Sequence, residues 1–395
     1  MLSIAQVGLR GFGHVHLERI DRLAAAGRIE LVAGSDPAGP LEGRDIPWYP
    51  SLTELLAHHD VDIVSIATPI GTHMALAEEA LAADSHVFLE KPPVASLGGF
   101  DHLVARSAAL GKAVQIGFQS LGGGGVARMR ELAAATLGEI QRVQVWGMWQ
   151  RDLAYFKRAR WAGHRVLDGA RVADGVCTNA LAHSIATACA IVGLRRPDDL
   201  SFIETELYHA FDTESDDTSW LRIHRPAGAS IDVSLSLCGP RVFPPTVTLV
   251  GTEGWASLLY TEDEVIWSRG GGDPHQAFVD GVELGAGAPV EHEQWGRMDL
   301  LENLVDHIED GVSLLVPVAQ TAGFMSALEA TQSVPDPTAI TSDVVWEGEG
   351  DAAHPIPDDL ERWQHVCLAT GQGYAAAGAP WASASAAARW SRAEL

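Results

Sequence analysis

The first 120 residues alternate between two hydrophobic patterns, and this alternation is the feature that most restricts the fold. Short apolar runs of strand length are separated by stretches in which apolar residues recur at helical spacing. The predicted strands are Ser3–Val7, Ile29–Gly34, Val61–Ala67, His86–Leu89 and Lys112–Ile116, and the predicted helices are His16–Ala26, Leu52–His58, Thr72–Ala83 and Phe100–Leu110. Strands that alternate with helices are joined by right-handed crossovers, so we predict an α/β domain with a parallel sheet.

The pattern changes after about residue 140, where strand-like segments follow one another directly. These segments are Ile140–Gln150, Ser201–Phe211, Ser219–His224, Ser230–Cys238, Thr246–Gly251 and Glu264–Ser268. Their succession predicts a mostly antiparallel sheet in an α+β domain. Helices are expected at Asn179–Val192, Met298–Gly311 and Ala319–Ser333.

A chain of 395 residues, at roughly 150 residues a domain, suggests two or three domains. We predict one domain at residues 1–120, a second at 121–340, and a C-terminal extension at 341–395. The extension is expected to begin as a linker, and its end either docks as a helix or is loosely ordered. The run Gly122–Gly125 is expected to be a flexible connector, and Asp212–Asp217 a solvated hairpin tip.

The charge balance excludes some classes of partner. There are 27 Lys and Arg against 52 Asp and Glu, which gives a formal charge of −25. This balance argues against non-specific nucleic-acid binding and against docking on anionic membranes. No apolar run reaches the ~18 residues of a membrane span, and the start lacks the basic flank of a signal peptide. Four scattered Cys and 16 His form no metal-binding motif. We therefore expect a soluble, cytoplasmic protein with a small-molecule partner and no metal.

The first predicted strand runs into a glycine-rich loop that is followed by a helix. The loop reads Gly8-Leu9-Arg10-Gly11-Phe12-Gly13-His14. In dinucleotide-binding folds the first Gly makes a tight turn, the second lets the backbone approach the pyrophosphate, and the third packs helix against strand. Arg10 stands in the second place, so either Gly11 shares that role or Arg10 itself contacts a phosphate. The alternative is a purely structural turn.

The second predicted strand ends at Asp36, about twenty residues past the loop, where dinucleotide sites place an acid on the ribose hydroxyls. A carboxylate there repels the additional phosphate of NADP, so we predict NAD in preference to NADP. The alternative is an ordinary turn Asp before Pro37. The order of strand, loop, helix, strand and acid favours a Rossmann domain.

Two later strand ends carry further motifs, Ala67-Thr68-Pro69 with His73 shortly after it, and Glu90-Lys91-Pro92-Pro93. Together with the glycine loop, these motifs resemble the Gfo/Idh/MocA family of glucose–fructose oxidoreductase and inositol dehydrogenase. The resemblance runs from residue 3 to about 120 and, more loosely, to about 340. It implies a Rossmann domain followed by an α+β domain with a large, open, mostly antiparallel sheet.

The resemblance implies an NAD(P)-dependent dehydrogenase that acts on a secondary alcohol of a sugar, inositol or related polyol. Lys91 would stand beside the nicotinamide and contact the substrate hydroxyl, because a partly desolvated lysine has a lowered pKa and can share a proton with an alcohol. The bond to Pro92 is typically cis in the family. The alternative for Lys91 is a solvated strand-end lysine. The implied cofactor-binding residues are Gly8, Arg10, Gly11, Phe12, Gly13, Asp36, Thr68, Pro69, His73, Glu90, Lys91 and Gln119.

The second-domain motif of the family places Asp and His four residues apart on a helix that crosses the substrate pocket. The matching residues here are Asn179 and His183, which would share one helical face. His183 is expected to be the general base, or else a core histidine. Asn179 can orient a hydroxyl but cannot take a proton. Asp174 either supplies the missing charge or caps the helix.

Aromatic and basic residues before this helix are expected to line the substrate pocket, because Trp161 offers a stacking face and Arg158 or Arg160 can bind a carboxylate or diol. A core Trp with solvated arginines is the alternative. The expected catalytic and substrate residues are thus Lys91, Arg158, Arg160, Trp161, Asp174, Asn179 and His183.

Two other functions stay open at this point. One is a glycosidase that retains NAD and uses transient oxidation. The other is a dinucleotide-binding regulator without catalysis, which Asn179 in place of Asp favours. The resemblance also implies a homo-oligomer, a dimer or tetramer, that pairs through the open face of the large sheet.

Overall fold

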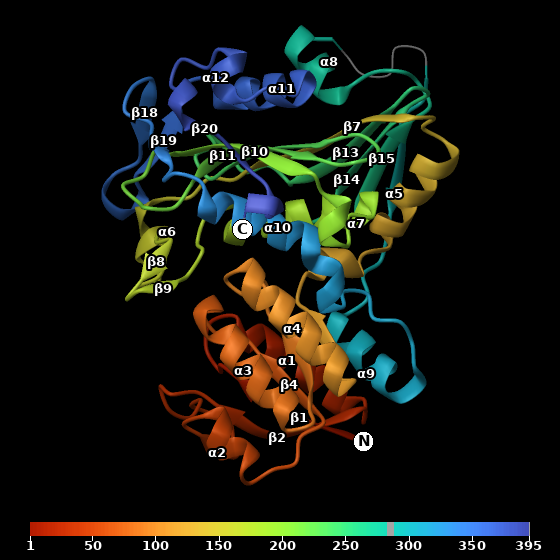
Figure 1. Ribbon diagram of the computed structural model, residues 1–395, viewed down its shortest axis with the longest axis vertical. Coiled ribbons are helices and arrows are strands. Elements are labelled where there is room, and N and C mark those ends of the chain that lie inside the picture. The colour runs from red at the N-terminus through yellow and green to blue at the C-terminus, as the bar shows by residue number, and fades with distance from the viewer. Residues whose placement is uncertain (283–287, 395) are drawn as a thin grey trace. The chain divides into compact units, whose positions relative to one another are not determined.

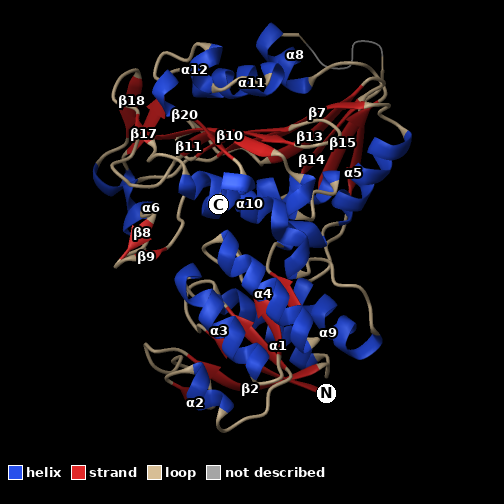
Figure 2. Cartoon of the chain, viewed as in Figure 1, coloured by secondary structure: helices blue, strands red, loops and turns tan. Residues whose placement is uncertain are grey.

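The N-terminal part of the chain is built on a parallel sheet with the strand order β3-β2-β1-β4-β5-β6 (Figures 1 and 2). The computed structural model describes residues 1–282 and 288–394. The strands are β1 (Leu2–Val7), β2 (Ile29–Ser35), β3 (Trp48–Tyr49), β4 (Ile63–Ile66), β5 (His86–Leu89) and β6 (Val114–Ile116). All neighbouring pairs are parallel. This order is that of a doubly wound Rossmann sheet, so the predicted α/β domain is confirmed.

The helices of this sheet are α1 (Gly13–Ala25), α2 (Leu52–Leu56), α3 (Ile70–Ala82) and α4 (Leu97–Leu110). The side chain of Ser51 accepts a hydrogen bond from the Glu54 N–H and so caps α2, and Ser96 caps α4 in the same way through the Gly99 N–H. Helix α1 buries an apolar stripe that contains Leu17, Ile20 and Leu23. Because these signals are local, the sequence was sufficient to predict all of these helices.

A distant segment, residues 298–321, belongs to the same compact unit as residues 1–122. It contains α9 (Leu300–Asp310), whose main chain meets the buried Gln115 of strand β6. The Gln115 amide donates to the Leu300 carbonyl at 2.9 Å and accepts from the Val316 N–H at 2.9 Å. Arg28 forms ion pairs with Asp306 and Glu309. A single buried amide thus joins two segments almost 200 residues apart, which local sequence patterns do not reveal.

The second compact unit contains a large sheet in the order β16-β15-β14-β13-β7-β12-β11-β10-β17, with β20 on β10. Its strands are β7 (Ile140–Met148), β10 (Phe202–His209), β11 (Thr218–His224), β12 (Ile231–Ser236), β13 (Thr246–Gly251), β14 (Trp255–Leu259), β15 (Glu264–Ser268), β16 (Glu291–Gln294), β17 (Thr338–Ala339) and β20 (Ala387–Trp390). Among the described residues, the pairs β7–β12 and β10–β17 are parallel and the others antiparallel. The predicted mostly antiparallel sheet is confirmed.

Helices cover both faces of this sheet (Figure 1). On one face lie α5 (Gly124–Ala135), α7 (Ala182–Val192) and α10 (Ala322–Ser333); on the other lie α8 (Pro274–Asp280), α11 (Leu360–Thr370) and α12 (Tyr374–Ala377). Smaller elements are α6 (Leu153–Lys157), β8 (Val166–Leu167), β9 (Ala170–Arg171), β18 (Val344–Glu347) and β19 (His354–Pro357). The second helical layer therefore includes residues of the predicted C-terminal extension.

The extension is an integral part of this unit. Leu360, Cys367, Tyr374 and Trp381 are buried in one apolar cluster with Tyr208 of β10. The Tyr374 hydroxyl lies 2.7 Å from Ser234 Oγ on β12, and β20 pairs antiparallel with β10. The end of the chain was expected either to dock or to be loosely ordered, and in the structure it docks on the sheet of the second unit.

Two smaller expectations were wrong at least in part. The run Gly122–Gly125 spans the boundary between the two compact units, as expected of a connector, but it is not loose, because Gly124 and Gly125 begin α5 and pack closely on Trp295 and Leu258. The stretch Asp212–Asp217 is not a solvated tip, because Asp216 and Asp217 are buried. Asp217 accepts hydrogen bonds from the N–H groups of Ala210 and Phe211, and burial raises its pKa to about 6. The run of acidic residues predicted exposure, but hydrogen bonds from the main chain of the turn stabilise Asp217 in a buried position.

A buried histidine pair makes the second unit sensitive to acid. His275 of α8 and His365 of α11 face each other with 2.8 Å between their Nδ1 atoms, beside Trp146 and Phe278. Burial lowers the pKa of both side chains, so the folded pair stays neutral while the unfolded chain takes up protons below about pH 6.5. The stability that the neutral pair contributes is present above this pH and is lost as the pH falls.

We expect the free energy of unfolding to fall by ~1.4 kcal/mol per pH unit and per histidine between about pH 6.5 and 5. Urea unfolding at a series of pH values measures this slope. The double variant His275→Met/His365→Met should lose most of it. His292→Gln, which removes an exposed histidine paired with Glu264, should keep it. An equal slope in the double variant would contradict the assignment.

Candidate active site

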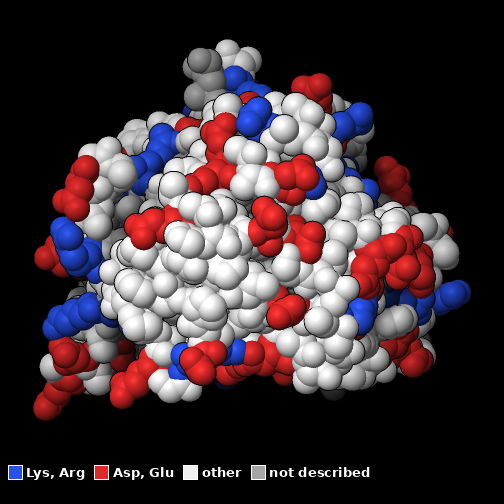
Figure 3. All heavy atoms as spheres, turned by 90° about the horizontal axis from the view of Figure 1, so that it is seen from below, with Lys and Arg blue, Asp and Glu red and all other residues white. Residues whose placement is uncertain are grey.

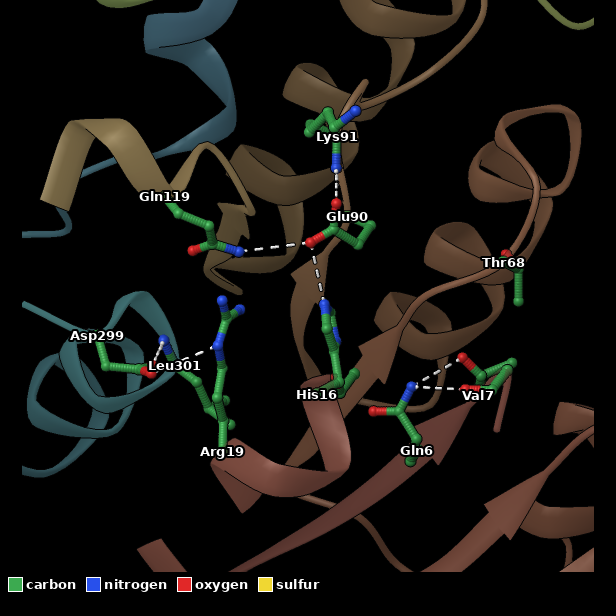
Figure 4. Close-up of polar contacts among 12 residues, drawn as sticks. Gln6, Val7, His16, Arg19, Thr68, Glu90, Lys91, Gln119, Asp299 and Leu301 are labelled. Atoms are coloured by element: carbon green, nitrogen blue, oxygen red, sulfur yellow. Dashed lines mark hydrogen bonds and ion pairs between the residues drawn. The ribbon is translucent and has the colours of Figure 1, made fainter. Parts of the chain in front are cut away.

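The turn between β1 and α1 is tight, and two glycines make it possible. Gly8 has φ +82°, and a Cβ atom on it would lie 2.3 Å from the Ala67 carbonyl oxygen. A Cβ atom on Gly13 would lie 2.1 Å from the Gly8 carbonyl oxygen. Gln6, buried on β1, donates to the carbonyls of Val7 and Gly8 from below (Figure 4). No larger residue fits at either glycine, so the loop has the geometry of a dinucleotide-binding turn.

The loop opens onto a cavity of about 620 Å³ within the first unit. Its lining includes Gly8, Arg10, Asp36, Thr68 and Pro69, all of which the sequence predicted as cofactor contacts. The volume is in the usual range for small-molecule sites. Among the described residues, the N–H groups of Gly11 and Phe12 have no acceptor, and both precede the first turn of α1. Free N–H groups at a helix N-terminus favour phosphate binding, so the residues fit the dinucleotide.

Asp36 is a buried carboxylate at the end of β2. Its Oδ2 accepts from the Leu9 N–H at 3.0 Å, and its Oδ1 accepts from the Ala38 N–H at 2.9 Å. Arg10 Nη1 lies 3.1 Å from the same Oδ1. Arg10 thus extends from the glycine loop toward Asp36 and lies at the wall of the cavity.

Glu90 is the centre of a hydrogen-bond network at the end of β5 (Figure 4). Its Oε2 accepts from the Lys91 main-chain N–H at 3.0 Å, and its Oε1 lies 3.1 Å from His16 Nε2 and 3.4 Å from Gln119 Nε2. His16 Nδ1 lies 2.8 Å from Ser65 Oγ. Glu90 and His16 are both buried, and a buried carboxylate needs such partners. The network fixes the main chain at Lys91, where the bond to Pro92 is cis, as the resemblance implied.

His73 lies beneath the two proline motifs. Its Nδ1 is 2.8 Å from the Pro92 carbonyl oxygen and its Nε2 is 2.9 Å from the Thr68 carbonyl oxygen. The side chain is buried, and burial lowers its pKa. The contacts of His73 connect the two turns to each other, which assigns it a structural role at the site.

Sequence reasoning missed Gln6, His16 and Ser65. All three are polar and fully buried in elements that are otherwise apolar on that side. A polar residue inside an apolar strand, or on the buried stripe of a helix, is the signal that could have identified them.

In the second unit, Asp174 lies next to the predicted Asn179. The Asn179 amide donates to Asp174 Oδ1 at 2.8 Å, and the Gly163 N–H donates to Oδ2 at 2.7 Å. Arg158 Nη2 is 3.9 Å from the same carboxylate. No side chain caps the helical turn 176–180. Asp174 was expected either to supply a negative charge beside Asn179 or to cap the helix. Its hydrogen bond with the Asn179 amide favours the first of these roles.

Asn179 and His183 do not belong to one continuous α-helix. Asn179 is part of a π-helical turn at 176–180, and α7 begins only at Ala182, after Leu181 with φ −110° and ψ 25°. The expected helical stretch at Asn179–Val192 is present, but as a π-helical turn followed by α7 and not as one continuous α-helix. The four-residue spacing does not by itself place the two side chains on one face.

Arg158 and Trp161 come together, whereas Arg160 does not join them. The Arg158 guanidinium lies 3.6 Å from the Tyr155 ring centroid and 4.7 Å from that of Trp161. Arg160 is exposed and pairs with Asp168 at 3.3 Å. Lys91, Gln119 and the glycine loop lie in the first unit, and the Asp174–Asn179 pair, Arg158, Trp161 and His183 lie in the second.

The fold and the loop geometry define a dinucleotide-binding domain. Residues 2–118 match the family model described as "Oxidoreductase family, NAD-binding Rossmann fold". The N-terminal domain of this chain is therefore similar to the Gfo/Idh/MocA family over these residues.

Several known proteins are similar to this chain. Inositol 2-dehydrogenase/D-chiro-inositol 3-dehydrogenase of Lacticaseibacillus casei is 27% identical over 137 residues, 33% of this chain and 40% of that protein. Glycosyl hydrolase family 109 protein 2 of Shewanella sp. (strain ANA-3) is 39% identical over 101 residues, 23% of this chain and 22% of that protein. The chain thus matches less than half the length of these relatives.

A solved structure extends the likeness to both units. The WlbA dehydrogenase of Bordetella pertussis, determined in complex with NADH and UDP-GlcNAcA, has a TM-score of 0.66 at 18% identity. The alignment covers 84% of this chain and 95% of that chain. At this identity the likeness concerns the fold.

Proposed function

We propose that this chain is an NAD-dependent dehydrogenase that transfers hydride between a secondary alcohol of a sugar, inositol or related polyol and the nicotinamide. The observation that carries the proposal is the Glu90 network, which holds Lys91 at the end of β5 in a domain of an NAD-binding family. When bound, NAD supplies the hydride acceptor. The relatives named as inositol dehydrogenases support the substrate class.

In the proposed reaction, the alcohol loses hydride from carbon and a proton from oxygen. Lys91 binds the hydroxyl and shares its proton, while Glu90 fixes the backbone that carries Lys91. His183 is the proposed proton acceptor, and Asn179, whose amide donates to the Asp174 carboxylate, is proposed to orient a hydroxyl. Arg158 and Trp161 are proposed to contact the substrate. Among the residues predicted to bind the substrate, Arg160 has the least structural support, because it is exposed and pairs with Asp168.

Partners other than a small molecule have little support. Among the described residues no helix is long and apolar enough to cross a membrane. On the face shown in Figure 3, basic side chains lie next to acidic ones and form no basic patch. We propose a cytoplasmic protein. We also propose a homo-oligomer; α11 and α12 lie on the sheet face opposite α7 and α10, so an interface on that face would include them (Figure 1).

The glycosidase alternative is supported by the 39% identity to the Shewanella protein. The two reactions differ in the fate of NADH, because a dehydrogenase releases it and a glycosidase that retains NAD reoxidises it in each cycle. Incubating the full chain with NAD and a panel of sugars, inositols and sugar acids, and following NADH absorbance, tests the proposal. We expect NADH to accumulate with at least one substrate.

Two results would contradict the proposed function. Cleavage of glycosides without accumulation of NADH would establish the glycosidase. Tight NAD binding without any reaction across the panel would favour the regulator, for which Asn179 argues.

A further inference from the structure

We propose that a second pocket, within the unit that carries the large sheet, binds a small ligand made of a single carboxylate and an apolar body. The pocket has a volume of about 430 Å³. It lies where α5 and α7, which share one face of the sheet, pack on each other and on β13 (Figure 1). Its lining contains none of the residues proposed for hydride transfer, so this site is independent of the proposed function.

Two arginines reach the pocket from different elements. Arg130 belongs to α5, and Arg225 directly follows β11 at the turn toward β12. Both side chains are partly buried, and among the described residues neither has a carboxylate oxygen within 4.0 Å. Burial lowers the pKa of the Arg130 guanidinium, and the charge of Arg195 lowers it further. Buried charges are normally paired, so the positive charge at this pocket favours an anion.

The same arginines contact the C-terminal end of α7. Arg130 Nε donates to the Ala190 carbonyl at 3.1 Å, and Arg225 Nη2 donates to the Val192 carbonyl at 3.0 Å. These bonds have a structural value, because they satisfy the last carbonyls of the helix. A helix C-terminus carries only about half a negative charge, however, and two guanidinium groups exceed it.

Each guanidinium retains N–H groups beyond those that contact the helix. Arg130 donates through Nε and Nη2 to the same carbonyl, and no described residue accepts from its Nη1. A Cβ atom on Gly228 would lie 3.1 Å from Arg225 Nη1, so the glycine in the turn leaves room for this guanidinium. Because the guanidinium fork matches the two oxygens of a carboxylate, the remaining N–H groups can bind one.

The rest of the lining decides the other properties of the ligand. Most of it is apolar, and its principal side chains are Ile140, Val143, Ile191, Val192 and Leu249. An apolar pocket with a few placed polar groups is typical of small-molecule sites. Glu139, an exposed acid, also lines the pocket. Its negative charge disfavours a second charge on the ligand, so a monocarboxylate fits better than a phosphate or a dicarboxylate.

The pocket is separate from the residues proposed to bind the substrate. His183 lies in the first turn of α7, whereas Val192 is its last residue. Nine residues at 1.5 Å each place about 13 Å of helix between them. The anion pocket is therefore at the opposite end of α7 from His183.

The experiment is titration calorimetry of the full chain with phenylacetate and with 2-phenylethanol, which has the same ring and no charge. We expect phenylacetate to bind at least about tenfold more tightly, because hydrogen bonds to a charged group are worth roughly a factor of ten or more. Arg130→Met and Arg225→Met should each lose most of this difference. Glu139→Gln should increase the affinity for phenylacetate, because it removes a competing negative charge.

Two further variants separate binding in the pocket from an effect on folding. Ala134→Trp changes an exposed position of α5 that lines the pocket, so it should block the site while both arginines stay in place. Arg196→Met removes an arginine that is 80% exposed and paired with Asp199, and it should leave phenylacetate binding unchanged.

Three results would overturn the proposal. The first is equal affinity of the unmodified chain for the two probes, or no binding of either, which would leave the arginines with only the capping of α7. The second is phenylacetate binding that persists in Ala134→Trp, which would place the ligand elsewhere. The third is an unchanged preference for phenylacetate in both arginine variants. None of these results bears on NAD reduction, so the proposed function is tested separately.

Discussion

We expect the substitution Lys91→Met to lower turnover by about a thousandfold or more and to leave the affinity for NAD nearly unchanged. The magnitude is typical for loss of a positioned proton-transfer group. Met has a similar length and no proton to share, so the hydroxyl loses its partner. Cofactor affinity is expected to persist because the glycine loop, the cavity and Asp36 do not involve the Lys91 side chain.

Steady-state kinetics with the substrate found in the panel, together with calorimetry for NAD, measures both quantities. Lys112→Met removes a lysine of the same domain, paired with Asp84, and should retain full turnover. Lys91→Arg keeps the charge but cannot release a proton, so it should be nearly as impaired as the Met variant. Substantial turnover in either Lys91 variant would refute the proposed role.

Ending the chain at Ile340 should abolish the folded state of the second unit. The truncation removes Leu360, Tyr374 and Trp381 from the cluster on the sheet. Each such side chain contributes roughly 1.5–3 kcal/mol through burial, and whole domains are stable by only ~5–15 kcal/mol. We expect the shortened protein to aggregate, since the exposed sheet face is apolar.

Point variants give a graded version of this test. Trp381→Ala, whose side chain is 5% exposed, should lower the free energy of unfolding by ~3–5 kcal/mol. Trp346→Ala removes the same side chain from the same extension, but Trp346 is 47% exposed, so the change should stay below ~1 kcal/mol. Thermal and urea unfolding provide the comparison. If both variants lowered the free energy of unfolding equally, burial of the extension against the sheet would not be what stabilises this unit.

The sequence was informative where structure follows from neighbours along the chain. The alternation of strand and helix, the Ser51 cap and the glycine loop each depend on residues a few positions apart. For the same reason, the local pattern predicts the motifs at Thr68 and Lys91 at strand ends, and they directly follow β4 and β5.

The sequence was less informative where a residue's surroundings come from elsewhere in the chain. Asp217 reads as a surface acid, yet it is buried, and the N–H groups of Ala210 and Phe211 donate hydrogen bonds to its carboxylate. The helix expected from Asn179 is interrupted at Leu181, since the π-helical turn satisfies the main chain differently.

By itself, the sequence determined the Rossmann sheet, the glycine turn, the acid at Asp36 and the lysine at the end of β5. These features are local, because strand order and turn geometry restrict which side chains can occupy each position. Only the tertiary structure decided that His16 and Ser65 support Glu90, that Asp36 holds Arg10, and that residues 360–381 cover the second sheet. The physical reason is that hydrogen-bond partners and buried surface come from segments that are distant in sequence, and folding alone brings them into contact.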